Sequence, residues 1–268
     1  MPVYSVIIPA HNEADRIGAT IREYSSVFRD GEIIAVLNQC SDDTADAVRR
    51  CGAANVRIIE IKAAIGKGGA VRAGFLMARA PLVGYVDADG STPAMELRRL
   101  FSLLDNAEAA IGSRWIRGAR LDPPQPFRRR LASRAFNLLA RALTGLPFSD
   151  TQCGAKAFRA DAVADVISSV ETANFAFDVD LLAALRRRGA RMIEVPIEWH
   201  DHSVSRLRIV HASLRMAGAL ARLAIKRSNV QWAVRLFDRL VPTQPLTIHE
   251  LATMCSNSVA LRPQPDEL

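Results

Sequence analysis

Residues 32–61 read EIIAVLNQCSDDTADAVRRCGAANVRIIEI, a stretch in which two apolar runs flank a polar segment with a helical pattern. Residues 32–37 and 56–61 are rich in Val and Ile, which is typical of strands. The segment 43–52 has a helical pattern, and Asp42 and Asp43 stand at its start, where aspartate is common. A strand, a helix and a second strand joined by short links predict a right-handed crossover between parallel strands. The fold class is therefore α/β.

The same alternation continues on both sides of this stretch. We expect strands at 4–8, 82–86 and 109–112, and helices at about 13–28, 67–80 and 93–105. Together they predict a doubly wound, mostly parallel, Rossmann-like sheet. After residue 115 the pattern changes to a proline-containing loop at 118–127, a helix at 128–143 and added strands at 155–159 and 191–199. In such sheets, ligands bind beyond the carboxyl ends of the strands, where the strand order reverses.

The charge balance favours anionic partners over other classes. The chain has 35 Lys and Arg against 28 Asp and Glu, a formal charge of +7. Aromatic residues make up only 6% and are not interleaved with basic ones, so we expect no nucleic acid as a partner. No apolar stretch is long enough to span a bilayer, and the start resembles a first strand more than a signal peptide. The four cysteines form no CxxC pair, which favours a reducing compartment and argues against a zinc site.

An Asp-Ala-Asp motif ends the strand predicted at 82–86. Residues i and i+2 of an extended segment point to one side, so Asp87 and Asp89 can converge on one hard cation. Mg²⁺ at nucleotide sites is usually held by one or two carboxylates and by phosphate oxygens. The alternative is that residues 89–93 form only a turn and a helix cap. The position at the end of a strand favours the metal site.

Two basic features could receive phosphate. Residues 66–70, GKGGA, open a helix, so its backbone N–H groups and Lys67 could meet an anion. The segment is neither a Walker A loop nor a GxGxxG fingerprint. Between residues 113 and 141 there are eight arginines and one carboxylate, Asp122. This cluster is either a solvated basic face or a phosphate site, and Arg114 lies at the ligand edge of the sheet.

Eight motifs in order resemble family 2 glycosyltransferases, and most of all the enzymes that transfer hexoses to polyprenyl phosphates such as dolichyl phosphate. They are VIIPAHNE, LNQCSDDTADAV, GKGGAVRAG, YVDADGS, GSR, DTQCGAKAF, FAFDVDLL and EWHDHSVSRL, and they cover residues 3 to about 210. The resemblance implies a glycosyltransferase-A fold with C-terminal amphipathic helices. The catalytic domain is expected over 1–206. Helical periodicity predicts an amphipathic extension over 207–240, and the last 28 residues, with four prolines and little periodicity, predict a weakly ordered tail over 241–268.

The resemblance also assigns roles to residues. For the nucleotide sugar it implies Pro9, Ala10, His11, Glu13, Asn38, Lys67, Asp87 and Ala88, with Glu13 towards the ribose. For Mg²⁺ or Mn²⁺ it implies Asp89 as principal ligand, with Asp87 and Ser91. For the acceptor phosphate it implies Arg114, Arg129, Arg130 and Arg206; Asp89, Arg114 and Arg206 are the catalytic set. His11, Asn38 and Ala155 depart from the tyrosine, aspartate and aromatic residue that the family often has there.

The implied reaction is an inverting displacement at the anomeric carbon of a UDP-glucose or GDP-mannose type donor. An acceptor phosphate is largely ionised at neutral pH and needs no strong base, whereas an alcohol would need one. Asp178 and Asp180 are candidates for that base, or else simply the first turn of a helix. Two alternatives stay open: a related glycosyltransferase with a soluble or glycan acceptor, and a non-catalytic nucleotide- or lipid-binding protein.

The segment 207–227 repeats apolar residues at spacings of three or four, with basic residues off that stripe. We expect it to lie on an anionic membrane surface, which would make the protein cytoplasmic and peripheral on the inner face of the membrane. The alternative is that the stripe packs on the catalytic domain or on a second copy in a homo-oligomer.

Overall fold

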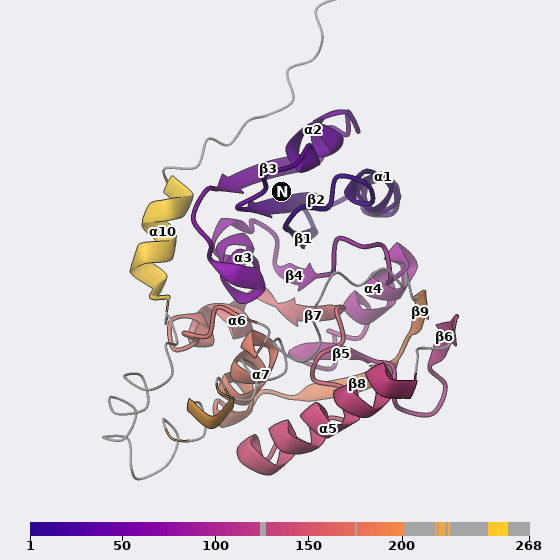
Figure 1. Cartoon of the computed structure of the whole chain (residues 1–268), viewed down its shortest axis with the longest axis vertical. Helices are drawn as coiled ribbons and strands as arrows, with labels where there is room; N and C mark the ends of the chain where they lie inside the picture. Colours follow the sequence, from indigo (N-terminus) through magenta and orange to yellow (C-terminus); the bar gives the residue numbers. More distant parts are fainter. Residues whose placement is uncertain are drawn as a thin grey trace, which may run out of the picture.

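A computed structural model describes residues 1–123, 127–174, 176–200, 218, 220–222, 225 and 246–256, with the backbone alone at 127–129. A seven-stranded sheet forms its centre, in the order β3-β2-β1-β4-β7-β5-β8 (Figure 1). Its strands are β1 (Tyr4–Ala10), β2 (Glu32–Asn38), β3 (Val56–Ile61), β4 (Leu82–Tyr85), β5 (Ala109–Ser113), β7 (Lys156–Arg159) and β8 (Met192–Pro196). All neighbours are parallel except β7, which is antiparallel to both β4 and β5. The predicted doubly wound, mostly parallel sheet is confirmed.

Helices cover both faces of the sheet, as its mostly apolar, buried central strands require. One face carries α1 (Ile17–Val27), α2 (Thr44–Arg49) and α4 (Ala94–Phe101); the other carries α3 (Gly66–Met77), α6 (Ala160–Ile167), α7 (Phe177–Arg187) and α10 (Ile248–Ser256). Each layer encloses its own buried apolar cluster. α5 (Phe127–Thr144) packs along the edge formed by β8 and contacts α7.

Three expectations about the second half differ from the structure. The loop predicted over 118–127 contains a short strand, β6 (Arg120–Asp122), and α5 begins at its last residue. The strand predicted at 191–199 is two strands, β8 and β9 (Glu198–His200), because β9 leaves the main sheet to pair with β6. The tail predicted over 241–268 contains α10, whose Leu251 is fully buried. Arg72 of α3 donates a 2.6 Å hydrogen bond to the Leu246 carbonyl, which fixes this segment to the core.

The extension predicted over 207–240 lies largely outside the described residues. The part that is described lies against the protein. Leu220 is fully buried in the cluster beneath α3, α6 and α7, and Arg222 Nη1 is 3.6 Å from Glu171 Oε2. These contacts favour the packing alternative at this point of the segment. In the part of the chain that the structure describes, no helix is both long and apolar enough to cross a bilayer.

Candidate functional site

The strand order reverses between β1 and β4, so their carboxyl ends open a crevice for a ligand. Residues 9–13 follow β1 and residues 87–91 follow β4, and these are the segments that the sequence singles out. At the β1 side His11 is exposed, and its Nδ1 donates to the Asn38 carbonyl over 2.8 Å. Glu13 forms an ion pair with Arg16, and its backbone N–H donates to Thr44 Oγ1 over 2.8 Å. Pro9 and Ala10 form the end of β1 itself.

Asn38 holds a loop rather than projecting into solvent. Its side chain is buried, and its Oδ1 accepts a 3.0 Å hydrogen bond from the backbone N–H of Ile65, just before α3. The amide therefore fixes where α3 begins. A direct contact between this side chain and a nucleotide base stays a prediction from the resemblance.

Lys67 and Asp87 form an ion pair beyond the carboxyl end of β4. Lys67 Nζ, in the first turn of α3, is 2.5 Å from Asp87 Oδ1. Burial alone would raise the pKa of Asp87, but Lys67, Lys156 and Arg114 outweigh it and hold that pKa below its ordinary value. Burial would likewise lower the pKa of Lys67, but Asp87 and Asp178 raise it overall. Both side chains are therefore charged at neutral pH.

Asp89 differs from Asp87 in its surroundings within the described part of the chain. Its Oδ1 accepts a 3.0 Å hydrogen bond from the Ser91 N–H, and among the described residues no lysine, arginine or histidine pairs with it. The Ser91 carbonyl accepts from the His200 N–H over 2.7 Å, so β9 closes over this turn. Ala88, between the two carboxylates, is buried. Its carbonyl accepts a 3.0 Å hydrogen bond from Thr20 Oγ1, which fixes the turn. No group of three or more metal-ligating side chains occurs in the described ranges.

This donor set fits a divalent cation only if the ligand supplies oxygens too. One unpaired carboxylate at the mouth of a crevice, with phosphate oxygens, is a usual Mg²⁺ environment. In the structure Lys67 holds Asp87, and the convergence of both carboxylates on one cation stays a prediction. Ser91 is buried, and its backbone N–H and carbonyl bond to Asp89 and His200, so a role of its hydroxyl as a metal ligand stays a prediction.

The glycine-rich start of α3 is packed against protein. The Gly69 N–H donates to the Ala173 carbonyl over 3.2 Å, and a Cβ on Gly68 would lie 2.5 Å from that of Phe177. Glycine is needed there because α7 approaches so closely. The N–H of Gly69 is thus used within the protein, and Lys67 is the element of this motif that faces the crevice.

Arg114 lies in a buried ion pair that sequence reasoning missed. Its Nε and Nη2 donate to the two oxygens of Asp150 over 2.7 and 3.0 Å, and its backbone N–H donates over 3.0 Å. The guanidinium also lies 4.9 Å from the Trp199 ring centre. Burial would raise the pKa of Asp150, but Arg114 lowers it below the ordinary value. The signal was the lone acid in DTQCGAKAF, which follows an arginine-rich stretch.

A second buried pair links the same loop to α7. Lys156 Nζ is 2.5 Å from Asp178 Oδ1 and 2.7 Å from the Cys153 carbonyl, and Tyr85 donates to the same Asp178 oxygen. Asp180 accepts from Thr172 Oγ1 over 2.9 Å and holds the loop before α7. Both carboxylates are buried, so neither is placed as an open base.

The remaining arginines predicted for the acceptor are not brought to the crevice in the part of the chain that the structure describes. Arg130 is exposed on α5, the side chain of Arg129 is not described, and Arg206 lies outside the described residues. Their roles stay predictions.

Burial and Asp150 raise the pKa of the Cys153 thiol to about 12, so that thiol is protonated and inert.

Comparison with known proteins gives consistent relatives. The family model described as glycosyl transferase family 2 matches residues 5–167. Glycosyltransferase AglD of Haloferax volcanii is 32% identical over 228 residues, covering 81% of this chain, which spans only 36% of that protein's length. Dolichyl-phosphate beta-glucosyltransferase ALG5D of Trichomonas vaginalis is 30% identical over 86% of this chain and 76% of that one. Undecaprenyl-phosphate mannosyltransferase of Micrococcus luteus is 29% identical over 74% and 84%.

The fold has solved counterparts as well. Glucosyl-3-phosphoglycerate synthase from Mycobacterium tuberculosis, in complex with Mn²⁺, UDP and glucosyl-3-phosphoglycerate, superposes with a TM-score of 0.63 at 19% identity, over 82% of this chain and 78% of that one. At this identity the likeness shows the shared fold alone, which is the predicted glycosyltransferase-A fold.

Proposed function

Because the chain belongs to glycosyl transferase family 2, we propose that it moves a hexose from a nucleoside-diphosphate sugar to a polyprenyl phosphate. Family membership makes it a glycosyltransferase. The finer assignment is supported by relatives named as dolichyl-phosphate glucosyltransferases and an undecaprenyl-phosphate mannosyltransferase.

The observation that carries the proposal is the different pairing of Asp87 and Asp89. Lys67 neutralises Asp87, whereas among the described residues no basic side chain pairs with Asp89. Asp89 would hold Mg²⁺ or Mn²⁺ together with the donor diphosphate, and structural neighbours bind these ions with UDP. The bound ion would stabilise the charge that develops on the leaving diphosphate. Asp87, with Lys67, would orient the nucleoside side of the donor.

The surroundings of two buried carboxylates support a phosphate acceptor. Asp178 and Asp180 are buried and hydrogen-bonded within the protein, so in this structure neither is an open base for an incoming hydroxyl. A phosphate monoester needs no such base, because it already carries negative charge at neutral pH. Its oxygen would attack the anomeric carbon, and the bond to the diphosphate would break with its electron pair leaving on the diphosphate. This supports a phosphate acceptor over an alcohol.

The test is transfer measured with a panel of UDP and GDP sugars and a short polyprenyl phosphate, with Mg²⁺, with Mn²⁺ and with chelator. Product that forms only with polyprenyl phosphate and metal supports the proposal. Transfer to a soluble phosphate ester or a glycan instead would support the alternative acceptor. Nucleotide binding without transfer to any acceptor would support the non-catalytic alternative.

The predicted acceptor site needs a variant of its own. We propose that Arg206 contacts the acceptor phosphate, so Arg206→Ala should raise the acceptor concentration needed at least tenfold, the loss of one charge-assisted contact. The donor requirement should stay unchanged. If the variant needs more donor but no more acceptor, Arg206 contacts the diphosphate instead.

A further inference from the structure

α5 presents an unusual apolar face to solvent. Leu138 is 68% exposed, Leu131 59%, and Leu139 and Leu143 38% each. With Ala135 and Ala142, which are also exposed, they recur at the spacing of one helix face. Half of the large hydrophobic side chains that are exposed in the described residues lie on this helix. We call this set, residues 131, 135, 138, 139, 142 and 143, the leucine face.

The outward direction of the leucine face is fixed by the opposite side of the helix. Asn137 and Ala140 are buried there. Asn137 Oδ1 accepts from both the backbone N–H and the Oγ1 of Thr151, over 2.9 and 2.7 Å. Rotating the helix to bury its leucines would break these buried hydrogen bonds, each costly to leave unmade. The same contacts attach α5 to the loop that carries Asp150, the partner of Arg114.

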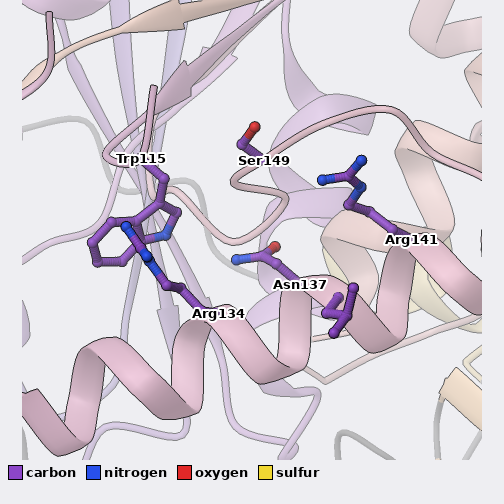
Figure 2. Close-up of a pocket in the computed structure, with 6 residues that line it drawn as sticks. Trp115, Arg134, Asn137, Arg141 and Ser149 are labelled. Carbon is purple, nitrogen blue, oxygen red and sulfur yellow. The ribbon is translucent and has the colours of Figure 1, made fainter. Parts of the chain in front are cut away.

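One edge of the leucine face is basic. Helical spacing places Arg130, Arg134 and Arg141 along the same side, and no carboxylate of the described residues pairs with them. The whole helix contains five arginines and no acidic residue. Arg134 and Arg141 line a cavity of about 280 Å³ between α5 and the loop at Ser149 (Figure 2). The Arg134 guanidinium lies 5.6 Å from the Trp115 ring centre at the cavity wall.

We propose that the leucine face of α5 docks on a membrane surface that contains anionic lipid, with Arg134 and Arg141 receiving a lipid phosphate. An apolar helix face beside basic residues is the pattern of helices that lie in a membrane interface. A second copy of this chain fits less well, because joining two such faces would bring arginines together with no acid to offset them. The surface differs from the 207–227 segment, of which Leu220 lies in the core.

The test is co-sedimentation of the full-length protein with vesicles of neutral lipid or of neutral lipid with one-third anionic lipid. We expect binding to the anionic vesicles that weakens with salt. Leu131→Glu with Leu138→Glu should weaken that binding at least tenfold, because two leucines that would enter the lipid are lost and two negative charges are added. Met95→Glu is the matched control, since Met95 is 63% exposed on α4, on another part of the surface. It should bind as the wild type does.

A second pair of variants tests the basic edge. Arg134→Ala with Arg141→Ala should weaken binding to anionic vesicles and flatten its salt dependence. Arg29→Ala with Arg50→Ala removes the same charge from exposed positions near α1 and α2 and should have little effect. Without lipid, the leucine variant should keep the circular dichroism spectrum and the UDP affinity of the wild type. Weaker vesicle binding with unchanged UDP binding therefore tests this proposal separately from the proposed function.

Three results would overturn the inference. Equal vesicle binding by the leucine variant and Met95→Glu would exclude the leucine face. Equal binding to neutral and anionic vesicles would exclude the phosphate contact. A dimer that light scattering detects without lipid, and that the leucine variant abolishes, would assign the face to a second copy.

Discussion

Gly154 is the residue through which the arrangement of Asp87 can be tested most directly. A Cβ at position 154 would lie 2.2 Å from Asp87 Oδ2 and 2.6 Å from its Cγ, whereas ordinary contact begins near 3.4 Å. Gly154→Ala therefore requires the carboxylate to move by about 1.2 Å. Since Lys67 Nζ is 2.5 Å from Asp87 Oδ1, a shift of about 1.2 Å can lengthen this contact to about 3.7 Å, beyond hydrogen-bond range.

The expected result is loss of nucleotide affinity without loss of fold. A misplaced Asp87 would lose a charge-assisted contact worth about 1.5–3 kcal/mol, so we expect Gly154→Ala to weaken UDP or GDP binding by about 10- to 100-fold. Isothermal titration calorimetry with Mn²⁺ measures the affinity, and thermal unfolding checks the fold. Gly18→Ala is the matched control, because its added Cβ would lie 3.5 Å or more from its neighbours.

A double-mutant cycle with Asp87→Ala decides whether the effect passes through Asp87. If it does, Gly154→Ala should cost little in the Asp87→Ala background, since no carboxylate remains to displace. The reasoning is refuted if Gly154→Ala weakens binding equally in both backgrounds, or if Gly154→Ala alone binds as the wild type does.

Three further predictions concern the metal, the buried ion pair and α10. Asp89→Ala should abolish metal-dependent donor binding and leave the fold intact; full activity in chelator, or normal transfer by the variant, would contradict this. Asp150→Asn should lower the free energy of unfolding at neutral pH by about 3–5 kcal/mol, because it leaves the Arg114 charge buried. Because the pKa of Asp150 is lowered in the folded state, its stabilisation is present above about pH 4 and lost as the pH falls through the folded value, so acid denaturation curves of the variant should be flatter there. Leu251→Ala should cost about 2–5 kcal/mol in urea denaturation, and a cost near zero would mean that α10 does not pack on the core.

The first half of the fold follows from local pattern, whereas the second half depends on contacts between distant residues. Strands such as β3 (Val56–Ile61) are found at their predicted bounds because a Val- and Ile-rich run between turn residues specifies a buried strand by itself. β9 (Glu198–His200) pairs with β6 over three residue pairs, and no local periodicity reveals this pairing. α10 follows prolines in a segment with little pattern, and its order comes from packing against α3.

The candidate site divides in the same way. The segments after β1 and β4 are predictable, because parallel strands bring their carboxyl ends to one edge. The partner of each charged group cannot be predicted in this way. Lys67 faces Asp87, and Arg114 faces Asp150, only because tertiary packing places them there. Sequence spacing predicts a shared cation for Asp87 and Asp89, which stays a prediction, but it does not reveal that Lys67 holds Asp87.

The antiparallel β7 also has a consequence for the order of assembly. It is inserted between β4 and β5, so residues 156–159 must arrive before those two strands can belong to one sheet. While the chain is being synthesised, β1–β4 can pair as soon as they emerge, but β4 then remains an open edge until residue 159 has been made. An open edge strand is a template for wrong pairing between chains. We therefore expect fragments that stop between residues 90 and 150 to aggregate, and the crevice to form only when β7 closes that edge.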